Sequence, residues 1–230
     1  MFIPINTAPS LATMAILAAI TIVEDAIPKS REDAKRKLGA VVKIVATLAK
    51  ETLKRKVGKP LLEDAELTLA CLQERVEGNF LKVQTVSAGT VVICSLAKGI
   101  THHSGIWLEN GTISELDGDG NYRAVNLETF LRGNEGERWR AGTFAYAACS
   151  LQGQPLGSND VAEIAQSFLG KKTKYSVDAN NCHRFSTACH SGGEAENVFR
   201  PNETFSVGKL LNRILCFHNK EKIRWIPIVA

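Results

Sequence analysis

Residues 180–193 read NNCHRFSTACHSGG and place Cys182 where a polar loop is expected to become a short helix. The backbone N–H groups and the dipole at the start of a helix favour negative charge, which lowers the pKa of a cysteine located there. A lower pKa populates the thiolate, and the thiolate is the nucleophilic form of cysteine. The stretch therefore predicts that Cys182 is a nucleophile rather than a buried structural cysteine.

A base for this thiol is offered by residues 102–108, HHSGIWL, which are expected to form a strand. Side chains alternate between the two faces of a strand, so His103 and Trp107 share one face while His102 points the other way. Nucleophilic cysteines are activated by a histidine within hydrogen-bond reach. His103 is the candidate base, and the adjacent His102 is the alternative.

Glu115 is the candidate for the group that orients His103. The Asn-Gly pair at 110–111 is a strong hairpin signal, and residues 112–116 form the second arm. Counting back from this turn brings Glu115 close to Trp107 rather than directly opposite His103, so the expected contact is diagonal or comes from a neighbouring strand. A carboxylate in that place would hold the imidazole tautomer and stabilise the imidazolium.

Two further groups of residues carry side chains that can bind metals, and neither group is expected to do so. The acidic loop 117–121, DGDGN, contains Asp117 and Asp119, which are rivals of Glu115, but its composition is more typical of a turn. The loop also lacks the EF-hand spacing and the closing Glu, which argues against calcium. The His and Cys residues near the nucleophile are not spaced like zinc ligands. These residues are Cys182, His183, Cys189 and His190.

The composition is that of an ordinary globular protein. The chain has 230 residues, enough for one full-sized domain and an appendage, with 44% hydrophobic and 23% charged residues. The net charge of +4 is a mild excess without a nucleic-acid-binding motif, so no nucleic-acid partner is expected. The six cysteines are scattered without a C-x-x-C pair, which favours a reducing, cytoplasmic location and a buried structural role for Cys94 and Cys149.

Residues 1–80 are predicted to form a helical N-terminal region. Residues 11–23, LATMAILAAITIV, are apolar, but no basic residue precedes them and they are shorter than the roughly 20 residues needed to cross a bilayer. A helix over 30–56 would carry many lysines and arginines on one face, and a second helix is expected over 61–76. Basic faces are usually only solvated, and the sharper expectation is peripheral contact with an anionic membrane.

From residue 81 to residue 230 the pattern is that of a mixed α+β domain. Strands are expected at 83–86, 90–94, 103–108, 112–116, 139–147 and 223–229. Helices are expected at 125–131, at 160–169, after Cys182 and at 206–217. The boundary between the two regions is therefore placed between residues 80 and 81.

Three motifs in this second region resemble the lecithin:retinol acyltransferase-like family of permuted papain-fold thiol enzymes. The family's H-x-G-I-Y-L strand is matched by residues 103–108, and its N-C-E-H-F segment by residues 181–185. The C-x-x-G that ends its nucleophile helix is matched by residues 189–192, and Tyr175 stands where the family often has a tyrosine. The resemblance covers residues 82–193 and depends on the order and spacing of short motifs.

The resemblance implies a permuted papain-like domain with a small antiparallel sheet packed on the nucleophile helix. It implies acyl transfer or hydrolysis through a thioester on Cys182, with His103 as general base and no cofactor. Tyr175, Trp107 and Asn181 would bind substrate. Two departures matter: the family's E-H after the nucleophile is replaced here by residues 183–184, HR, and a position that is often a second His in the family falls on Glu115.

The sequence leaves three functional classes open. The first is a thiol-dependent acyltransferase or hydrolase that acts on a lipid or another acyl-bearing substrate. The second is a cysteine peptidase or amidase of the same fold. The third is a non-catalytic binding domain, although the presence of Cys182, His103 and Glu115 argues against a decayed site.

Overall fold

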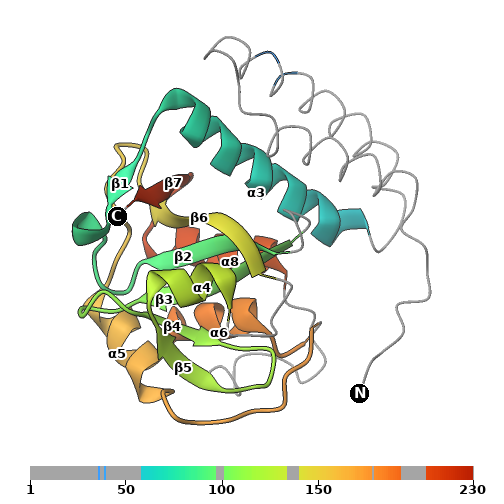
Figure 1. Ribbon diagram of the computed structural model, residues 1–230, viewed down its shortest axis with the longest axis vertical. Coiled ribbons are helices and arrows are strands. Elements are labelled where there is room, and N and C mark those ends of the chain that lie inside the picture. The colour runs from blue at the N-terminus through green and yellow to red at the C-terminus, as the bar shows by residue number, and fades with distance from the viewer. Residues whose placement is uncertain are drawn as a thin grey trace.

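The structure is a computed structural model that describes Arg36, Gly39 and residues 58–96, 101–133, 140–177, 179–192 and 206–229. Within these ranges the chain forms one seven-stranded sheet and five α-helices, an α+β arrangement (Figure 1). The predicted segments 11–23 and 30–56 lie almost wholly outside the described residues, so their helices and their membrane contact stay predictions. Among the helices that are described, none has the length and apolar character needed to cross a bilayer.

A meander of four antiparallel strands forms one half of the sheet. These strands are β2 (Val91–Leu96), β3 (Thr101–Trp107), β4 (Ile113–Leu116) and β5 (Tyr122–Val125). The other half consists of β6 (Arg140–Cys149), β7 (Arg224–Val229) and β1 (Leu81–Lys82). The order across the sheet is β1-β7-β6-β2-β3-β4-β5, and only the β1–β7 pair is parallel. Strand β3, which carries His103, therefore lies inside the sheet.

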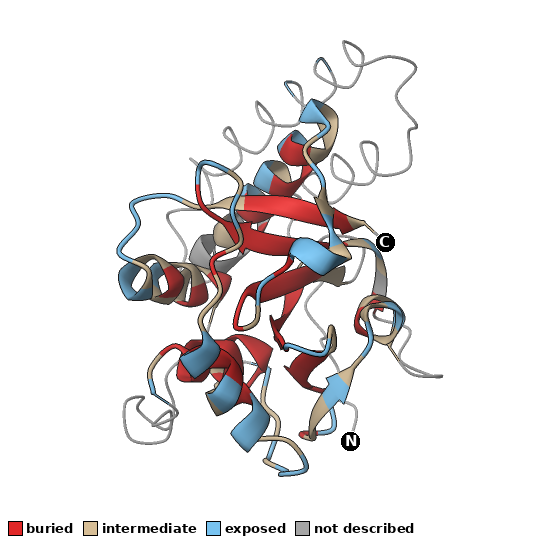
Figure 2. Ribbon diagram, turned by 90° about the vertical axis from the view of Figure 1, so that its left-hand side faces the viewer, coloured by how far each residue is buried: buried red, intermediate tan, exposed pale blue. Residues whose placement is uncertain are grey.

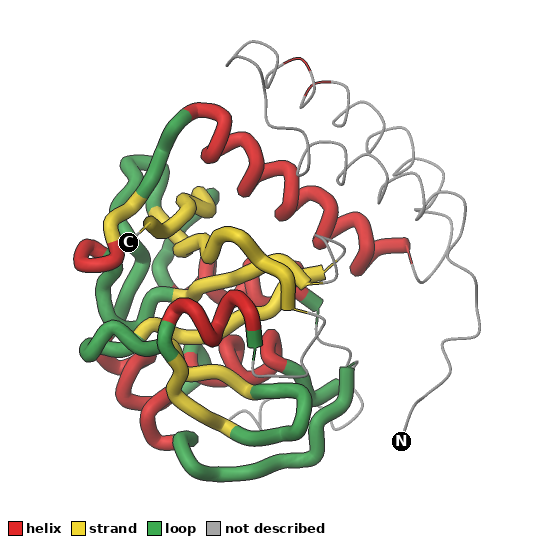
Figure 3. Tube along the Cα trace, viewed as in Figure 1, coloured by secondary structure: helices red, strands yellow, loops and turns green. Residues whose placement is uncertain are grey.

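Helices cover both faces of this sheet (Figures 1 and 3). Four helices contribute side chains to one apolar cluster with the sheet: α3 (Gly58–Glu77), α5 (Asn159–Ser167), α6 (Cys182–Cys189) and α8 (Val207–Phe217). The short helix α4 (Leu127–Arg132) packs through Phe130 into a second cluster on the other face. Asn126 caps α4, because its side chain accepts the Thr129 backbone N–H at 2.8 Å.

The central strands are buried on both faces. In β2, Val91 and Ile93 belong to the cluster with α3, α6 and α8, while Val92 and Cys94 belong to the cluster with α4. All four side chains are 0% exposed. This period of two is the alternation of a pleated strand, and Figure 2 shows the resulting buried layer in the middle of the molecule.

Helix α3 shares its core with the sheet. Leu67 and Cys71 join the same apolar cluster as Trp225 of β7. At the C-terminal end of α3, Glu74 accepts a hydrogen bond of 2.8 Å from Nε of Arg224. Helix α3, which lies in the predicted N-terminal region, is therefore packed against the sheet.

Most of the elements predicted between residues 58 and 229 are present. The expectation of a strand over 83–86 is wrong, because residues 83–85 form a 3₁₀ turn, η1 (Val83–Thr85). The second helix, expected over 61–76, is α3 and begins three residues earlier, at Gly58, with Pro60 in its first turn. A proline fits there because the N–H groups of the first turn have no partner within the helix. The helix expected from residue 125 begins at Leu127, after strand β5.

The close pairing of β3 with β4 depends on Gly105. A Cβ atom at this position would lie 2.6 Å from Cγ2 of Ile113 and 2.8 Å from the carbonyl oxygen of Ser114. We expect Gly105→Ala to lower the free energy of unfolding by about 1–3 kcal/mol, the usual cost of overpacking. Urea denaturation followed by circular dichroism would measure the change. The matched control is Gly118→Ala, whose new Cβ meets nothing within 4 Å. Equal stability of the two variants would contradict this packing.

Candidate active site

Helix α6 begins at Cys182, as predicted. Asn181 is its N-cap: the side-chain Oδ1 accepts the Arg184 backbone N–H at 3.0 Å, and Nδ2 donates to the Val177 carbonyl at 2.7 Å. These two bonds fix the direction in which the loop enters the helix. They place the Cys182 sulfur in the first turn, where the helix dipole favours a thiolate.

His103 lies just beyond the point where the pairing of β3 with β4 ends. The last paired residues are Gly105 and Glu115, so on β3 the pairing extends only over residues 105–107. The His103 ring packs on Phe130, with 5.2 Å between ring centroids, and its Nε2 lies 2.8 Å from Oε2 of Glu115. The contact is diagonal, one of the two possibilities that the hairpin register left open, and Glu115 itself pairs with Gly105 rather than lying next to Trp107. The second ring nitrogen, Nδ1, is left to face Cys182.

Cys182 and His103 are hydrogen-bonded to each other and are 4% exposed each. Burial opposes both charges, raising the pKa of the thiol and lowering that of the imidazole. The opposite charge of the partner and the hydrogen bond between the two groups outweigh burial. The pKa of Cys182 therefore falls below its ordinary value, and the pKa of His103 rises to about 9. Both shifts favour the charged pair, a thiolate and an imidazolium.

Glu115 is held as a carboxylate by three cations. Besides His103, its Oε2 accepts from Nη1 of Arg140 at 2.7 Å, and its Oε1 accepts from Nε of Arg123 at 2.9 Å. Burial alone would raise the pKa of Glu115, but the hydrogen bond and charge of His103, followed by those of Arg140, lower it to about 2. The carboxylate therefore stays ionised and can fix the His103 tautomer throughout the neutral range.

The sequence analysis did not identify Arg123 and Arg140, although the position of Arg123 could have been found from the β4–β5 hairpin. Arg123 lies directly opposite Glu115 in the β4–β5 register, and counting outward from the 117–121 turn would have found it. Arg140 comes from β6, which is not adjacent to β4 in the sheet. Its contact with Glu115 depends on how elements far apart in the sequence pack together, and it could not be read from a local pattern.

The alternative base, His102, points to the opposite face, as the alternation of the strand predicted. Its Nδ1 lies 2.9 Å from Oδ1 of Asp64 on α3, and its Nε2 lies 3.3 Å from Oγ1 of Thr68. These bonds join β3 to α3. The structure therefore separates the two adjacent histidines, with His103 at Cys182 and His102 at Asp64.

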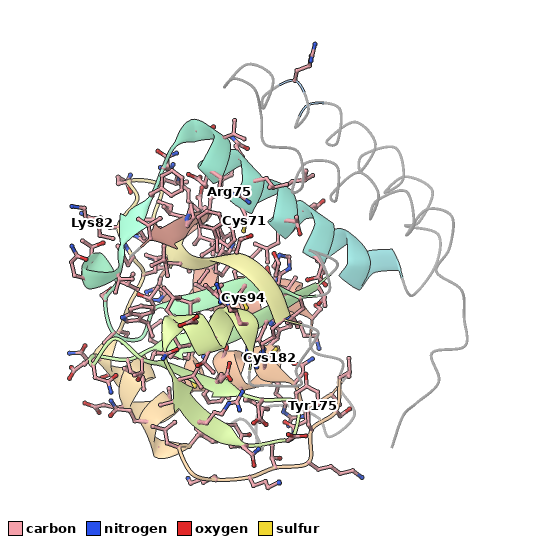
Figure 4. The ribbon with its side chains drawn as sticks, viewed as in Figure 1. Cys71, Arg75, Lys82, Cys94, Tyr175 and Cys182 are labelled. Carbon is pink, nitrogen blue, oxygen red and sulfur yellow. The ribbon has the colours of Figure 1, made fainter. Side chains whose placement is uncertain are left out.

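The three residues expected to bind substrate differ in their surroundings. Tyr175 is half-buried near Cys182 (Figure 4), and burial, followed by the negative charge of Cys182, raises its pKa, so its phenol stays protonated. Asn181 acts as the helix cap described above. Trp107 is 2% exposed in the core cluster that contains Phe130. Of the three, Tyr175 is the one that is partly exposed as well as close to Cys182.

The acidic loop 117–121 forms a turn, as its composition indicated. Oδ1 of Asp117 accepts the backbone N–H groups of Asp119 and Asn121 at 2.9 and 2.8 Å. Asp117 also lies 3.3 Å from Nη1 of Arg123, so it supports the Glu115 cluster rather than replacing Glu115. Within the part of the chain that is described, no group of three or more His, Cys, Asp or Glu side chains is placed to hold a metal ion.

We expect Cys182 to be the most reactive thiol of the protein at neutral pH. Burial raises the pKa of the other enclosed thiols, which are Cys71, Cys94, Cys149 and Cys189. Iodoacetamide labelling at pH 6–7, read by peptide mass spectrometry, should modify Cys182 first in a Cys216→Ser background that removes the exposed thiol. Preferential labelling of Cys94 or Cys149 would show that the nucleophile is wrongly assigned.

Comparisons of the chain with protein-family models, with curated proteins and with solved structures found no match. The resemblance carried by residues 103–108 and 181–192 therefore stays a prediction. Function is inferred from the geometry around Cys182, His103 and Glu115.

Proposed function

We propose that the protein is a cysteine-dependent acyltransferase or hydrolase that forms a thioester on Cys182. The observation that carries the proposal is the hydrogen-bonded chain from Cys182 through His103 to Glu115, buried at the start of a helix. Nucleophile, base and orienting group are the three parts that thiol catalysis requires. In this chain each of them comes from a different element: α6, β3 and β4.

In the proposed reaction the Cys182 thiolate attacks the carbonyl carbon of an acyl group. The negative charge passes from sulfur to the carbonyl oxygen, which the Cys182 backbone N–H stabilises at the start of α6. The carbonyl then re-forms, the bond between its carbon and the leaving group breaks, and the His103 imidazolium protonates the leaving group, which leaves a thioester on Cys182. In the second half, His103 takes a proton from water or another acceptor, which attacks the thioester and releases the Cys182 thiolate.

A lipid is the favoured acyl substrate. The motif resemblance supports this choice, as do the apolar residues 11–23 and the lysines and arginines that follow them, which suit contact with an anionic membrane. A cysteine peptidase or amidase would use the same three residues. A non-catalytic binding domain would not require a charged Cys182–His103 pair.

Trapping of the thioester distinguishes these functions. The protein would be incubated with phosphatidylcholine vesicles, with a p-nitrophenyl acyl ester and with a peptide library, then quenched in acid for intact mass measurement. An added acyl mass that is absent from Cys182→Ala supports the acyl enzyme. Cleavage of peptides without acylation by either ester would support the peptidase, and no reaction with any substrate would support a binding domain.

We expect Glu115→Gln to reduce turnover by about tenfold to hundredfold, because it removes one charge-assisted hydrogen bond of about 1.5–3 kcal/mol from the imidazolium. It will also lower stability, since Arg140 is 9% exposed and loses its carboxylate partner. Turnover would therefore be measured well below the melting temperature of the variant. The matched control is Asp117→Asn, which changes a neighbour of Arg123 without touching His103. Equal losses in both variants would remove the orienting role from Glu115.

The rate of acyl transfer should fall as the pH rises through about 9, the raised pKa of His103. Above that pH the imidazole loses the proton that it gives to the leaving group. Alkylation by iodoacetamide requires only the thiolate and should not fall in the same range. Both rates should fall on acidification, when Cys182 is protonated. The rates of acyl transfer and of alkylation would be measured as functions of pH on one sample. If both rates fell above pH 9, the assignment of His103 as the acid would be contradicted.

A further inference from the structure

Three buried polar side chains behind the nucleophile take no part in the triad. Ser104, Ser186 and His183 are 0%, 0% and 5% exposed. Oγ of Ser104 lies 3.0 Å from Nδ1 of His183 and accepts a hydrogen bond of 3.0 Å from the Ser186 hydroxyl. Ser104 also approaches the nucleophile, because both its backbone N–H and its side chain lower the pKa of Cys182. Three polar groups, from His183, Ser186 and Cys182, thus surround one hydroxyl.

The tautomer of His183 follows from its two partners. One ring nitrogen, Nδ1, faces Ser104, and the ring also hydrogen-bonds the backbone of His102. The His102 backbone raises the pKa of His183, as a carbonyl acceptor does, and Nδ1 lies at Ser104, so we assign the ring proton to Nε2. Burial lowers the pKa of His183 to about 4, with Asp64 opposing the shift and with His102 and His103 reinforcing it. The ring therefore holds a single proton, and Nδ1 can only accept.

The single proton of the Ser104 hydroxyl consequently has two acceptors, Nδ1 of His183 and the sulfur of Cys182. The Ser104 oxygen is already satisfied by Ser186. We propose that Ser104 is a catalytic residue whose hydroxyl turns to the sulfur when Cys182 is a thiolate and returns to His183 when the sulfur is acylated. His183 is then a positioning residue that holds the hydroxyl during the neutral states of Cys182. No bond is made or broken at Ser104, and only the direction of its O–H changes.

Two variants should shift the thiolate in opposite directions. Ser104→Ala removes a donor to the thiolate and should raise the pKa of Cys182, so that alkylation by iodoacetamide well below that pKa slows by about tenfold. His183→Leu removes the competing acceptor, so that the hydroxyl stays on the sulfur and alkylation at the same pH becomes faster. The matched control is Ser114→Ala, which removes a hydroxyl that is equally buried but bonds the Ala165 carbonyl at 3.3 Å.

The experiment is the pH profile of Cys182 alkylation in the full chain, with all variants in a Cys216→Ser background. Opposite shifts for Ser104→Ala and His183→Leu, with an unchanged profile for Ser114→Ala, support the proposal. An unchanged profile for Ser104→Ala, or an unchanged or slower reaction for His183→Leu, overturns it. The inference rests on the proposed nucleophile, but iodoacetamide requires no acyl substrate, so the absence of acyl transfer would count against the proposed function alone.

A measurement on the parent chain covers the case in which a variant does not fold. Nitrogen chemical shifts of ¹⁵N-labelled histidine report the tautomer of each ring. His183 should be the neutral Nε2–H form between pH 6 and 8, and its Nδ1 shift should change when Cys182 is alkylated. An Nδ1–H tautomer, or a shift that does not respond to alkylation, overturns the proposal.

Discussion

The site depends on a buried pair of opposite charges. A thiolate or an imidazolium alone in this position would bear the cost of losing its hydration, and each would be driven to its neutral form. Together, Cys182 and His103 keep both charges, because each supplies the other with a counter-charge and a hydrogen bond. Buried pairs of this kind are stable only when the remaining polar atoms are also satisfied. Glu115 does this for the imidazolium, and Ser104 does it for the thiolate.

The fold brings these groups together because the pairing of β3 with β4 ends before it reaches His103. Because the β3–β4 ladder stops at Gly105, His103 extends beyond the paired part of β4, and helix α6 packs against β3 with Cys182 in its first turn. The N-cap bond of Asn181 sets the helix start at that residue. On the face of β3 opposite His103, His102 is tied to Asp64 of α3, while Phe130 of α4 packs on His103, so the strand that carries the base is held from both faces.

Local patterns predicted the parts of the site, and only the folded chain assembles them. The helix start at Cys182 and the alternation that separates His103 from His102 follow from geometry within one element, whereas the hairpin register left a diagonal contact of Glu115 as one of two possibilities. The 3₁₀ turn after β1 was mispredicted as a strand, and the second helix begins at Gly58 rather than at residue 61, because β-branched composition and Gly/Pro signals are weak when tertiary packing decides. Arg140 and the hydroxyl of Ser104 depend on contacts between distant elements, which no local pattern encodes.

The charge pair itself can be measured through the titration of His103. In the parent chain the imidazole should stay protonated up to about pH 9, as its pKa of about 9 requires. In Cys182→Ala the thiolate is gone, burial and the charge of Arg140 oppose the imidazolium, and the ring should lose its proton at a clearly lower pH. Nitrogen-detected NMR of ¹⁵N-histidine would follow both samples. The same titration in both proteins would contradict a thiolate–imidazolium pair between Cys182 and His103.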